Sequence, residues 1–297
     1  MGMVKEVLQI KKWLNEITNI LFYFCLFVVI LVVLQVFVVT SFRIPSDSME
    51  PSLLAGDYIL VDKCSGGARL FDVLDAVEKK EVVIHRMPSW KNYQRNDVLV
   101  FNFPYLENHW DSIALDVMKY YVKRCIALPG DTLEIRNGYY KIYGVLGNVG
   151  NLIAQRQMSE LPDSGTSVVM SSFPGGNRLK WTVKEFGPLS IPAKGQVVGM
   201  DSTSWLLYRQ LISWEQKKRL CIDADNRVYL GDSLIQEYHF RENYYFVSGD
   251  KMENSKDSRY WGLLPEPFIV GKAWRIWKSV DNMSENIRWE RIWKKID

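Results

Sequence analysis

The sequence predicts a mostly β protein, built from antiparallel strands and preceded by one N-terminal membrane-spanning helix. An apolar run extends from Ile20 to Val39 and is broken only by Gln35. The chain is rich in aromatic residues, with 11 Trp, 15 Tyr and 13 Phe, which suits a β-rich fold or a surface that meets a membrane. Short β-prone runs separated by turn residues follow the apolar run. The 297 residues leave room for one large or two modest domains beyond the membrane segment.

The apolar run is long enough to cross a bilayer, because about 20 helical residues cover roughly 30 Å. A cleaved signal peptide and a buried core helix are the alternatives. A signal peptide has a shorter apolar core and small residues at its cleavage site, whereas Thr40-Ser41-Phe42 follows here. We therefore predict an uncleaved anchor over residues 17–40. Lysines in residues 1–16 place the N-terminus in the cytoplasm, so the chain from Ser41 onward lies on the other side.

The remaining elements are read from apolar runs and turn signals. Strands are expected over 58–62, 98–101, 118–128, 228–230, 244–247, 268–277 and 287–293, with a short helix near 71–81 and a loop over 102–116. Residues 139–227, rich in Gly, Ser and Pro, are expected to form an inserted accessory β subdomain. The β domain that carries the insertion would then consist of residues 41–138 and 228–297.

Composition excludes some functions. A net charge of +3 is too small to indicate a nucleic-acid partner. Cys25 lies in the apolar run, and Cys64, Cys125 and Cys221 show no C-x-x-C spacing and no nearby His pair. A zinc site is therefore not expected, while one cysteine pair is allowed. No metal or organic cofactor is implied.

A proline-flanked serine follows the anchor, in the stretch Arg43-Ile-Pro-Ser-Asp-Ser-Met-Glu-Pro-Ser-Leu53. Pro45 and Pro51 fix their own φ angles and push the residues before them towards extended conformations. Ser48 thus lies on a stiff, non-helical segment that suits a nucleophile. The alternative is a plain polar linker next to the membrane.

A serine nucleophile needs a base. His85, His109 and His239 are scattered and have no acidic partner at a suggestive spacing, which disfavours a Ser-His-Asp triad. Lysine can serve instead if burial lowers its pKa from about 10.4 by several units. Lys123 lies within the apolar run 118–128 and is the best candidate. The alternative for Lys123 is a solvated side chain on a strand.

Four motifs, in order, resemble those of bacterial type I signal peptidases (leader peptidases), the Ser-Lys peptidases of family S26. Residues 48–53 (SMEPSL) resemble the S-M-x-P-T-L box, and residues 96–101 (NDVLVF) resemble the G-D-V-V-V-F strand. Residues 123–131 (KRCIALPGD) resemble K-R-x-x-G-x-P-G-D. Residues 249–262 (GDKMENSKDSRYWG) resemble G-D-N-x-x-N-S-x-D-S-R-x-W-G. The resemblance covers roughly residues 17–275.

The resemblance implies roles for individual residues. Ser48 would be the nucleophile and Lys123 its general base, with the hydroxyl of Ser46 and the Ser48 backbone N–H in the oxyanion hole. Ser255 would hydrogen-bond the lysine. Asp257 and Arg259 would form a structural ion pair that supports the loop. Simple turn stabilisation is the alternative role for Ser255, and it is all that we expect of Asp257 and Arg259. The positions expected to contact the substrate before the cut are Phe42, Ile44, Met49, Tyr121 and Val122.

Three positions depart from the family pattern. Lys251 replaces an Asn and Ala127 replaces a Gly, but neither position carries the proton transfer, so activity is expected to survive. Asp47 stands where the family often has a small residue. Its charge would raise the pKa of Lys123 if it pointed inward. On an extended segment it is expected to face away from Ser46 and Ser48.

The resemblance therefore implies a serine endopeptidase that removes N-terminal signal peptides from exported preproteins. It would be a single-pass protein of the bacterial inner membrane, with its catalytic domain on the periplasmic face. Its partners would be preproteins, the lipid bilayer and the export machinery, without nucleic acid. Two alternatives stay open: an enzyme dedicated to one substrate, and a non-catalytic anchored protein that binds exported chains. Self-cleavage, as in the related repressor proteases, is disfavoured because those proteins carry a DNA-binding domain in place of an anchor.

Overall fold

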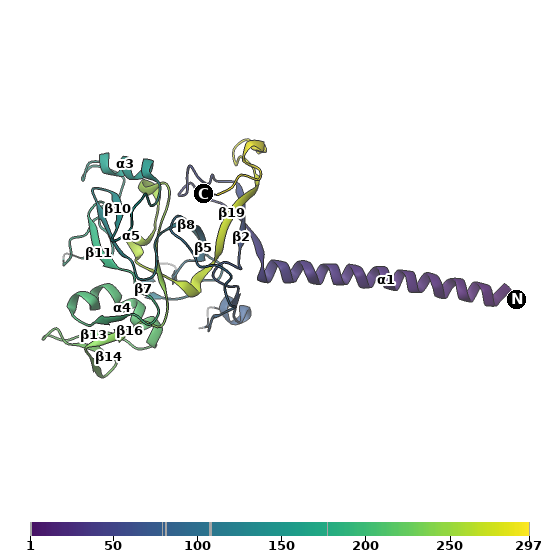
Figure 1. The fold of residues 1–297 in the computed structure, drawn as a ribbon, viewed down its shortest axis with the longest axis horizontal. Coiled ribbons are helices and arrows are strands. Elements are labelled where there is room, and N and C mark those ends of the chain that lie inside the picture. The colour runs from purple at the N-terminus through teal and green to yellow at the C-terminus, as the bar shows by residue number, and fades with distance from the viewer. Residues whose placement is uncertain (1, 79, 81, 107–108, 177, 297) are drawn as a thin grey trace.

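The N-terminal helix stands apart from a β-rich body. The computed structural model describes residues 2–78, 80, 82–106, 109–176 and 178–296. Helix α1 (Gly2–Phe37) projects from one end of the body (Figure 1). Its segment Lys11–Phe37 is long and apolar enough to cross a membrane, and none of it is buried against the body. The predicted spanning helix is thus confirmed, although it ends before residue 40 because strand β1 (Val39–Arg43) already begins there.

The body is fixed to the C-terminal end of α1 by a lysine. The last turn of α1 contains no basic residue of its own. Lys63 supplies one, because its Nζ donates to the carbonyl oxygens of Gln35 and Val36 at 2.9 and 3.2 Å. These helix-end carbonyls have no partner within the helix and favour a cation. The soluble body therefore begins at the end of the span without a flexible linker.

The central element is a seven-stranded sheet with the order β1-β2-β19-β5-β8-β17-β18. Its neighbouring strands pair antiparallel, which confirms the predicted fold class. The strands after β1 are β2 (Asp57–Asp62), β19 (Ile269–Ser279), β5 (Val98–Asn102), β8 (Tyr120–Ala127), β17 (Tyr244–Ser248) and β18 (Leu264–Pro265). Each of the expected strands 58–62, 98–101, 118–128, 244–247 and 268–277 lies in this sheet.

Smaller sheets surround the central one. Three strands form the order β10-β9-β11, and three others form β13-β14-β15. Two-stranded pairs are β12 with β16, β3 with β4, and β6 with β7. Their bounds are β3 (Arg69–Leu70), β4 (His85–Arg86), β6 (Tyr105–Leu106), β7 (His109–Ile113), β9 (Thr132–Arg136), β10 (Tyr139–Ile142), β11 (Phe186–Ser190), β12 (Val197–Gly199), β13 (Leu220–Ile222), β14 (Val228–Leu230), β15 (Ser233–Ile235) and β16 (Glu237–His239).

Several short helices complete the described chain. They are α2 (Val73–Val77), α3 (Leu152–Glu160), α4 (Ser202–Gln216), α5 (Ser258–Trp261), and the 3₁₀ turns η1 (Met252–Asn254), η2 (Glu266–Phe268) and η3 (Trp289–Arg291). The helix expected near 71–81 is confirmed as α2. The loop expected over 102–116 is wrong in part, because β6 and β7 pair within it.

The segment 139–227 contains two helices that we did not predict. Asp201 caps α4, since its side chain accepts from the backbone N–H groups of Thr203 and Ser204. Helix α4 then buries apolar side chains at helical spacing, namely Leu207, Tyr208, Leu211 and Ile212. Both signals are visible in the sequence. The boundary of a separate subdomain at residue 139 stays a prediction. Strand β10, which begins at this boundary, pairs with β9 on the other side of it.

The C-terminal tail does not form the expected strand over 287–293. It makes an isolated bridge at Ile287 and then the turn η3. Within residues 287–293 the buried side chain is Arg291, whose Nη2 donates to Asp57 Oδ2 at 2.5 Å. Trp289 and Trp293 are instead 73% and 59% exposed. A buried charge pair thus overrides the alternation that suggested a strand.

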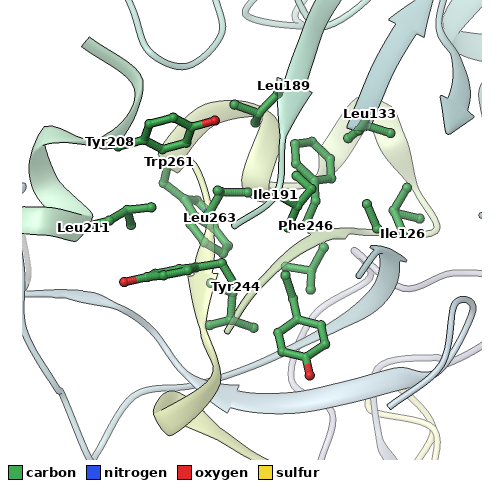
Figure 2. Packing of buried hydrophobic residues seen from close by; sticks show 14 of the residues in the cluster. Ile126, Leu133, Leu189, Ile191, Tyr208, Leu211, Tyr244, Phe246, Trp261 and Leu263 are labelled. Atoms are coloured by element: carbon green, nitrogen blue, oxygen red, sulfur yellow. The ribbon is translucent and has the colours of Figure 1, made fainter. Parts of the chain in front are cut away.

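One hydrophobic cluster joins the central sheet to the segment 139–227. Figure 2 labels Ile126, Phe246 and Leu263 together with Leu189 and Leu211 of the segment 139–227, and all of these side chains are buried in the same cluster. Burial of apolar surface is the main favourable term in folding. The inserted segment therefore packs as a continuous part of the body.

Candidate active site

Ser48 lies in a turn between β1 and β2. Residues 46–53 form bends and turns rather than the extended segment that we expected. Within the turn, Leu53 N–H donates to the carbonyl of Met49 at 2.9 Å, and both of these side chains are buried. The buried pair holds the turn against the sheet. The Ser48 side chain is half-buried and available at the surface.

Lys123 reaches Ser48 from the middle of the central sheet. In β8 it pairs with Leu99 of the fully buried strand β5. Lys123 Nζ donates to Ser48 Oγ at 2.5 Å across 75 residues of sequence. The amine also lies 6.0 Å from the ring centroid of Tyr121, two residues earlier on the same strand. The two candidate residues predicted from sequence are thus brought together.

Burial lowers the pKa of Lys123. The residue is only 3% exposed, and this desolvation lowers the pKa of its amine to about 8. The charges of Asp257, Asp250 and Asp47 act in the opposite direction, while that of Arg259 also lowers the pKa. About a tenth of the amine is therefore neutral at pH 7 and about half at pH 8, and this neutral form is able to accept a proton.

The predicted ion pair of Asp257 and Arg259 is confirmed, and both side chains are fully buried. Arg259 donates to Asp257 through Nε and Nη2, each at 2.8 Å, and Nη2 also donates to the carbonyl of Met252 at 2.8 Å. Asp257 further accepts from the N–H of Gly249 at 3.0 Å and the hydroxyl of Ser248 at 3.1 Å. The pair therefore fixes the loop 249–259 onto the end of β17.

Ser255 differs from its expected role. Its hydroxyl is buried but makes no hydrogen bond to Lys123 or to any other described residue. Ser255 instead packs against the backbone of Gly249, where an added Cβ would lie 2.3 Å from Ser255 Oγ and 2.5 Å from the Ser48 carbonyl oxygen. Only glycine allows this approach. The expected hydrogen bond between Ser255 and Lys123 is therefore not formed in this structure.

A second buried ion pair was missed in the sequence analysis. Arg124 donates to Asp250 through Nε and Nη2, each at 2.6 Å, and Nη2 also reaches Ser52 Oγ at 3.1 Å. It links β8, the Ser48 turn and the loop after β17. Arg124 lies in the motif of residues 123–131, and Asp250 lies in the motif of residues 249–262. Their positions in these motifs could have indicated that they belong to the site.

The segment 139–227 also contributes to the support of the site. Tyr140 donates from its hydroxyl to Ser248 Oγ at 2.6 Å, and Ser248 in turn contacts Asp257. Asn151 Nδ2 donates to the carbonyl of Asp250 at 3.2 Å. None of the catalytic or substrate-contact residues expected from the sequence lies in this segment. Its contacts show that it stabilises the loop behind Lys123.

The residues expected to bind substrate fall into two groups. Ile44 and Met49 are 2% and 1% exposed and belong to the core beneath the site. Phe42 and Val122 are half-buried and pack against that core, while Tyr121 stacks on Phe103 with ring centroids 4.6 Å apart. Ser46, the expected oxyanion donor, is exposed beside Ser48. Their contacts with substrate stay predictions.

The remaining candidates lie outside the site. His85 and His239 are exposed, and the side chain of His109 is outside the described part of the chain. All four cysteines are free thiols, so the cysteine pair that the sequence allowed is not formed. Among the described residues, no group of three or more His, Cys, Asp or Glu side chains is placed to hold a metal ion.

A serine hydroxyl in contact with a buried lysine is the arrangement of a serine hydrolase that uses lysine as its base. Comparison with known proteins gives the family. The family described as "Signal peptidase, peptidase S26" matches residues 16–277. The chain belongs to this family and is a serine peptidase. With the apolar helix α1, this membership identifies a membrane-anchored protein.

Curated relatives agree over most of the chain. The signal peptidase I of Pseudomonas aeruginosa is 31% identical and covers 87% of this chain and 70% of its own. Those of Buchnera aphidicola subsp. Schizaphis graminum and Aquifex aeolicus are each 27% identical. They cover 93% and 86% of this chain and 79% and 82% of their own. A solved signal peptidase I from Enterococcus faecalis is 21% identical with a TM-score of 0.30, covering 62% of this chain and 98% of its own. A score this low adds nothing to the assignment.

Proposed function

We propose that this chain is a membrane-anchored endopeptidase that removes signal peptides from exported preproteins, with Ser48 as nucleophile and Lys123 as general base. The observation that carries the proposal is the 2.5 Å contact between Lys123 Nζ and Ser48 Oγ. Family membership supports the substrate class. The low exposure of the amine supports its role as a base at neutral pH.

The reaction begins with neutral Lys123, which takes the proton of Ser48 as Oγ attacks the scissile carbonyl carbon. The Ser48 N–H and the Ser46 hydroxyl donate to the oxyanion of the tetrahedral intermediate, a contribution often worth about 3 kcal/mol per donor. The protonated amine then gives its proton to the leaving nitrogen, and the C–N bond breaks. Water then attacks the acyl carbon, and Lys123 accepts a proton from the water and passes it to Ser48 Oγ as the C–Oγ bond breaks.

Substrate selection follows from the half-buried side chains around Ser48. Phe42 and Val122 flank the apolar core at Ile44, and Tyr121 continues the strand that carries Lys123. We propose that these residues line shallow apolar pockets for the small side chains before the cut. Ile44 and Met49 support the pocket floor, since their side chains are almost fully buried.

The anchor places the site at a fixed height. At about 3.3–3.6 Å per residue, the chain from Val39 to Ser48 keeps the nucleophile within about 30 Å of the outer boundary of the span. We propose the bacterial inner membrane, with the N-terminus in the cytoplasm and the body on the periplasmic face. Lysines before the span support this orientation.

Tryptophans at the membrane end of the body support contact with lipid. Trp274, Trp277, Trp289 and Trp293 are 39%, 41%, 73% and 59% exposed, so none is buried between strands. Trp277 Nε1 donates to Ser41 Oγ at 2.7 Å, close to the end of α1. Figure 1 shows β19 at the end of the body from which α1 leaves. Exposed tryptophans suit the membrane–water interface.

The alternatives of a dedicated enzyme, or of a non-catalytic binder, make different predictions for the same experiment. The detergent-solubilised protein is incubated with several unrelated preproteins, and the products are sequenced from their N-termini. We expect one cut at the end of each signal peptide, and no cut with Ser48→Ala. Cleavage of only one preprotein would indicate a dedicated enzyme, and binding without cleavage would refute the proposal. Contact with the export machinery is a further proposal that co-purification would test.

A further inference from the structure

Two departures from the family pattern contact each other at the active site. Lys251 stands where the family has Asn, and Asp47 where it often has a small residue. Lys251 Nζ donates to Asp47 Oδ2 at 2.6 Å and to Glu50 Oε2 at 3.1 Å. Asn254 Nδ2 donates to both carboxylate oxygens of Asp47, at 3.0 and 3.1 Å. The two substitutions are thus complementary in charge and joined across 204 residues of sequence.

The same loop also holds the backbone of the nucleophile. The N–H of Lys251 donates to the carbonyl of Ser48 at 3.1 Å. Gly249, two residues earlier, packs against that carbonyl and against Ser255. Lys251 therefore contacts the nucleophile segment through its backbone at Ser48 and through its side chain at Asp47 and Glu50. Any change in its charge acts within two residues of the reacting hydroxyl.

The carboxylates around Lys123 each have a basic partner. Asp257 is paired with Arg259, and Asp250 is paired with Arg124. Asp47 is the third carboxylate whose charge acts on the amine, and Lys251 is its partner. Lys123 itself is buried and faces the hydroxyl of Ser48 and the ring of Tyr121. Its tendency to hold a proton therefore depends on how completely these three carboxylates are compensated.

We propose that Lys251 is a positioning residue of the active site, which compensates the charge of Asp47 so that a carboxylate can stand beside the nucleophile without keeping Lys123 protonated. The inference rests on the proposed roles of Ser48 and Lys123. A different role, in which the pair only clamps the turn, makes a distinct prediction. A clamp would change the rate equally at all pH values, whereas charge compensation moves the pH at which the rate rises.

The test measures kcat/KM against pH on a short signal-peptide substrate. The rising limb is the pH range over which kcat/KM increases. In Lys251→Met, Asp47 and Glu50 lose their compensating charge, so we expect this limb to move to higher pH. Asp47→Asn leaves Lys251 with one carboxylate fewer, and the limb should move to lower pH. Each shift should be about 0.5 pH unit, below the 1–3 units typical of close buried charges, because the pair is partly exposed and screened.

Combined and conservative variants complete the test. The double variant Asp47→Asn/Lys251→Met restores the net charge of the cluster, so its limb should return to the wild-type position. Lys251→Arg should also keep that position. Raising the salt concentration should reduce the single-variant shifts. Lys256→Met is the matched control, since it removes an exposed lysine of the same loop, and it should leave the limb unchanged.

The outcomes separate this inference from the proposed function. Limbs that stay fixed in both single variants, or that move in the same direction, would overturn the role of Lys251. If Lys251→Met fails to fold, as judged by its melting temperature, the Asp47→Asn shift alone decides the question. Full activity of Ser48→Ala or Lys123→Ala would instead overturn the proposed function. An inactive Ser48→Ala together with unmoved limbs would overturn only the inference.

Discussion

Buried positive charge is stabilised differently in the proposed catalytic pair, Ser48 and Lys123, and in the supporting loop 249–259. Lys123 lies against the hydroxyl of Ser48, without a carboxylate in direct contact among the described residues. In the supporting loop, the guanidinium of Arg259 makes two hydrogen bonds to Asp257, and both side chains are fully buried. A buried cation without a counter-charge gives up its proton, whereas a matched pair stays ionised. The first region is therefore suited to proton transfer and the second to holding a structure.

Removal of either member of the catalytic pair should have the largest effect. We expect Ser48→Ala and Lys123→Ala each to reduce kcat/KM to below roughly a thousandth of the wild-type value, since the nucleophile or its base is lost. The measurement is cleavage of a preprotein at enzyme excess, with the melting temperature as a check of folding. More than a few per cent of the wild-type rate in Ser48→Ala would show that the assigned nucleophile is wrong.

Replacing Lys123 with Arg separates charge from basicity. Arginine stays protonated in proteins, so Lys123→Arg should be about as inactive as Lys123→Ala although it keeps the positive charge. Preprotein cleavage at pH 7 to 10 measures this. A near-normal rate at any pH in this range would rule out lysine as the general base.

The supporting region should lose stability. Arg259→Met leaves the carboxylate of Asp257 buried and uncompensated, which typically costs about 3–5 kcal/mol. The melting temperature should fall by roughly 10 °C, given about 2–4 °C per kcal/mol for a body of this size. Arg156→Met is the control, because the Arg156–Glu160 pair is exposed and worth little. Equal melting temperatures for the two variants would contradict the structural role of the buried pair.

The pH dependence should report the catalytic lysine. Neutral Lys123 is the proposed active form and its pKa is lowered to about 8, so kcat/KM should rise about tenfold per pH unit below that pH and level off above it. Stopped assays on a short peptide between pH 6 and 10 give the curve. A rate that is flat from pH 6 to 9 would mean that another group, or a lysine with a lower pKa, acts as the base.

Removal of the anchor should have the smallest effect on chemistry and a selective effect on substrate. A soluble form that begins near Ser41 should cleave short peptides at the normal rate. On preproteins in liposomes it should be roughly tenfold slower or more, because the anchor raises the effective concentration of the site. Added lipid or detergent should stimulate it. Equal rates of the two forms in liposomes would mean that the anchor does not position the site.

The local sequence determined the membrane span and the main strands. It also singled out Ser48 as the candidate nucleophile and Lys123 as the candidate base. Apolar runs and turn residues are read along the chain, and the four motifs carry the family resemblance directly. The strand signals placed Lys123 on a buried strand, which the sheet confirms. The same local reading contained the cap and apolar face of α4, which we overlooked.

Only the tertiary structure decided which charges meet. The sequence separation is 126 residues between Arg124 and Asp250, and it is 204 residues between Asp47 and Lys251. These contacts depend on strand register and on how one loop lies against another. The tail shows the same limit, since Arg291 is drawn inward by Asp57 while the neighbouring tryptophans face outward. Local periodicity reports which side chains prefer burial. It cannot report a buried charge that is stabilised by a partner from a distant part of the chain.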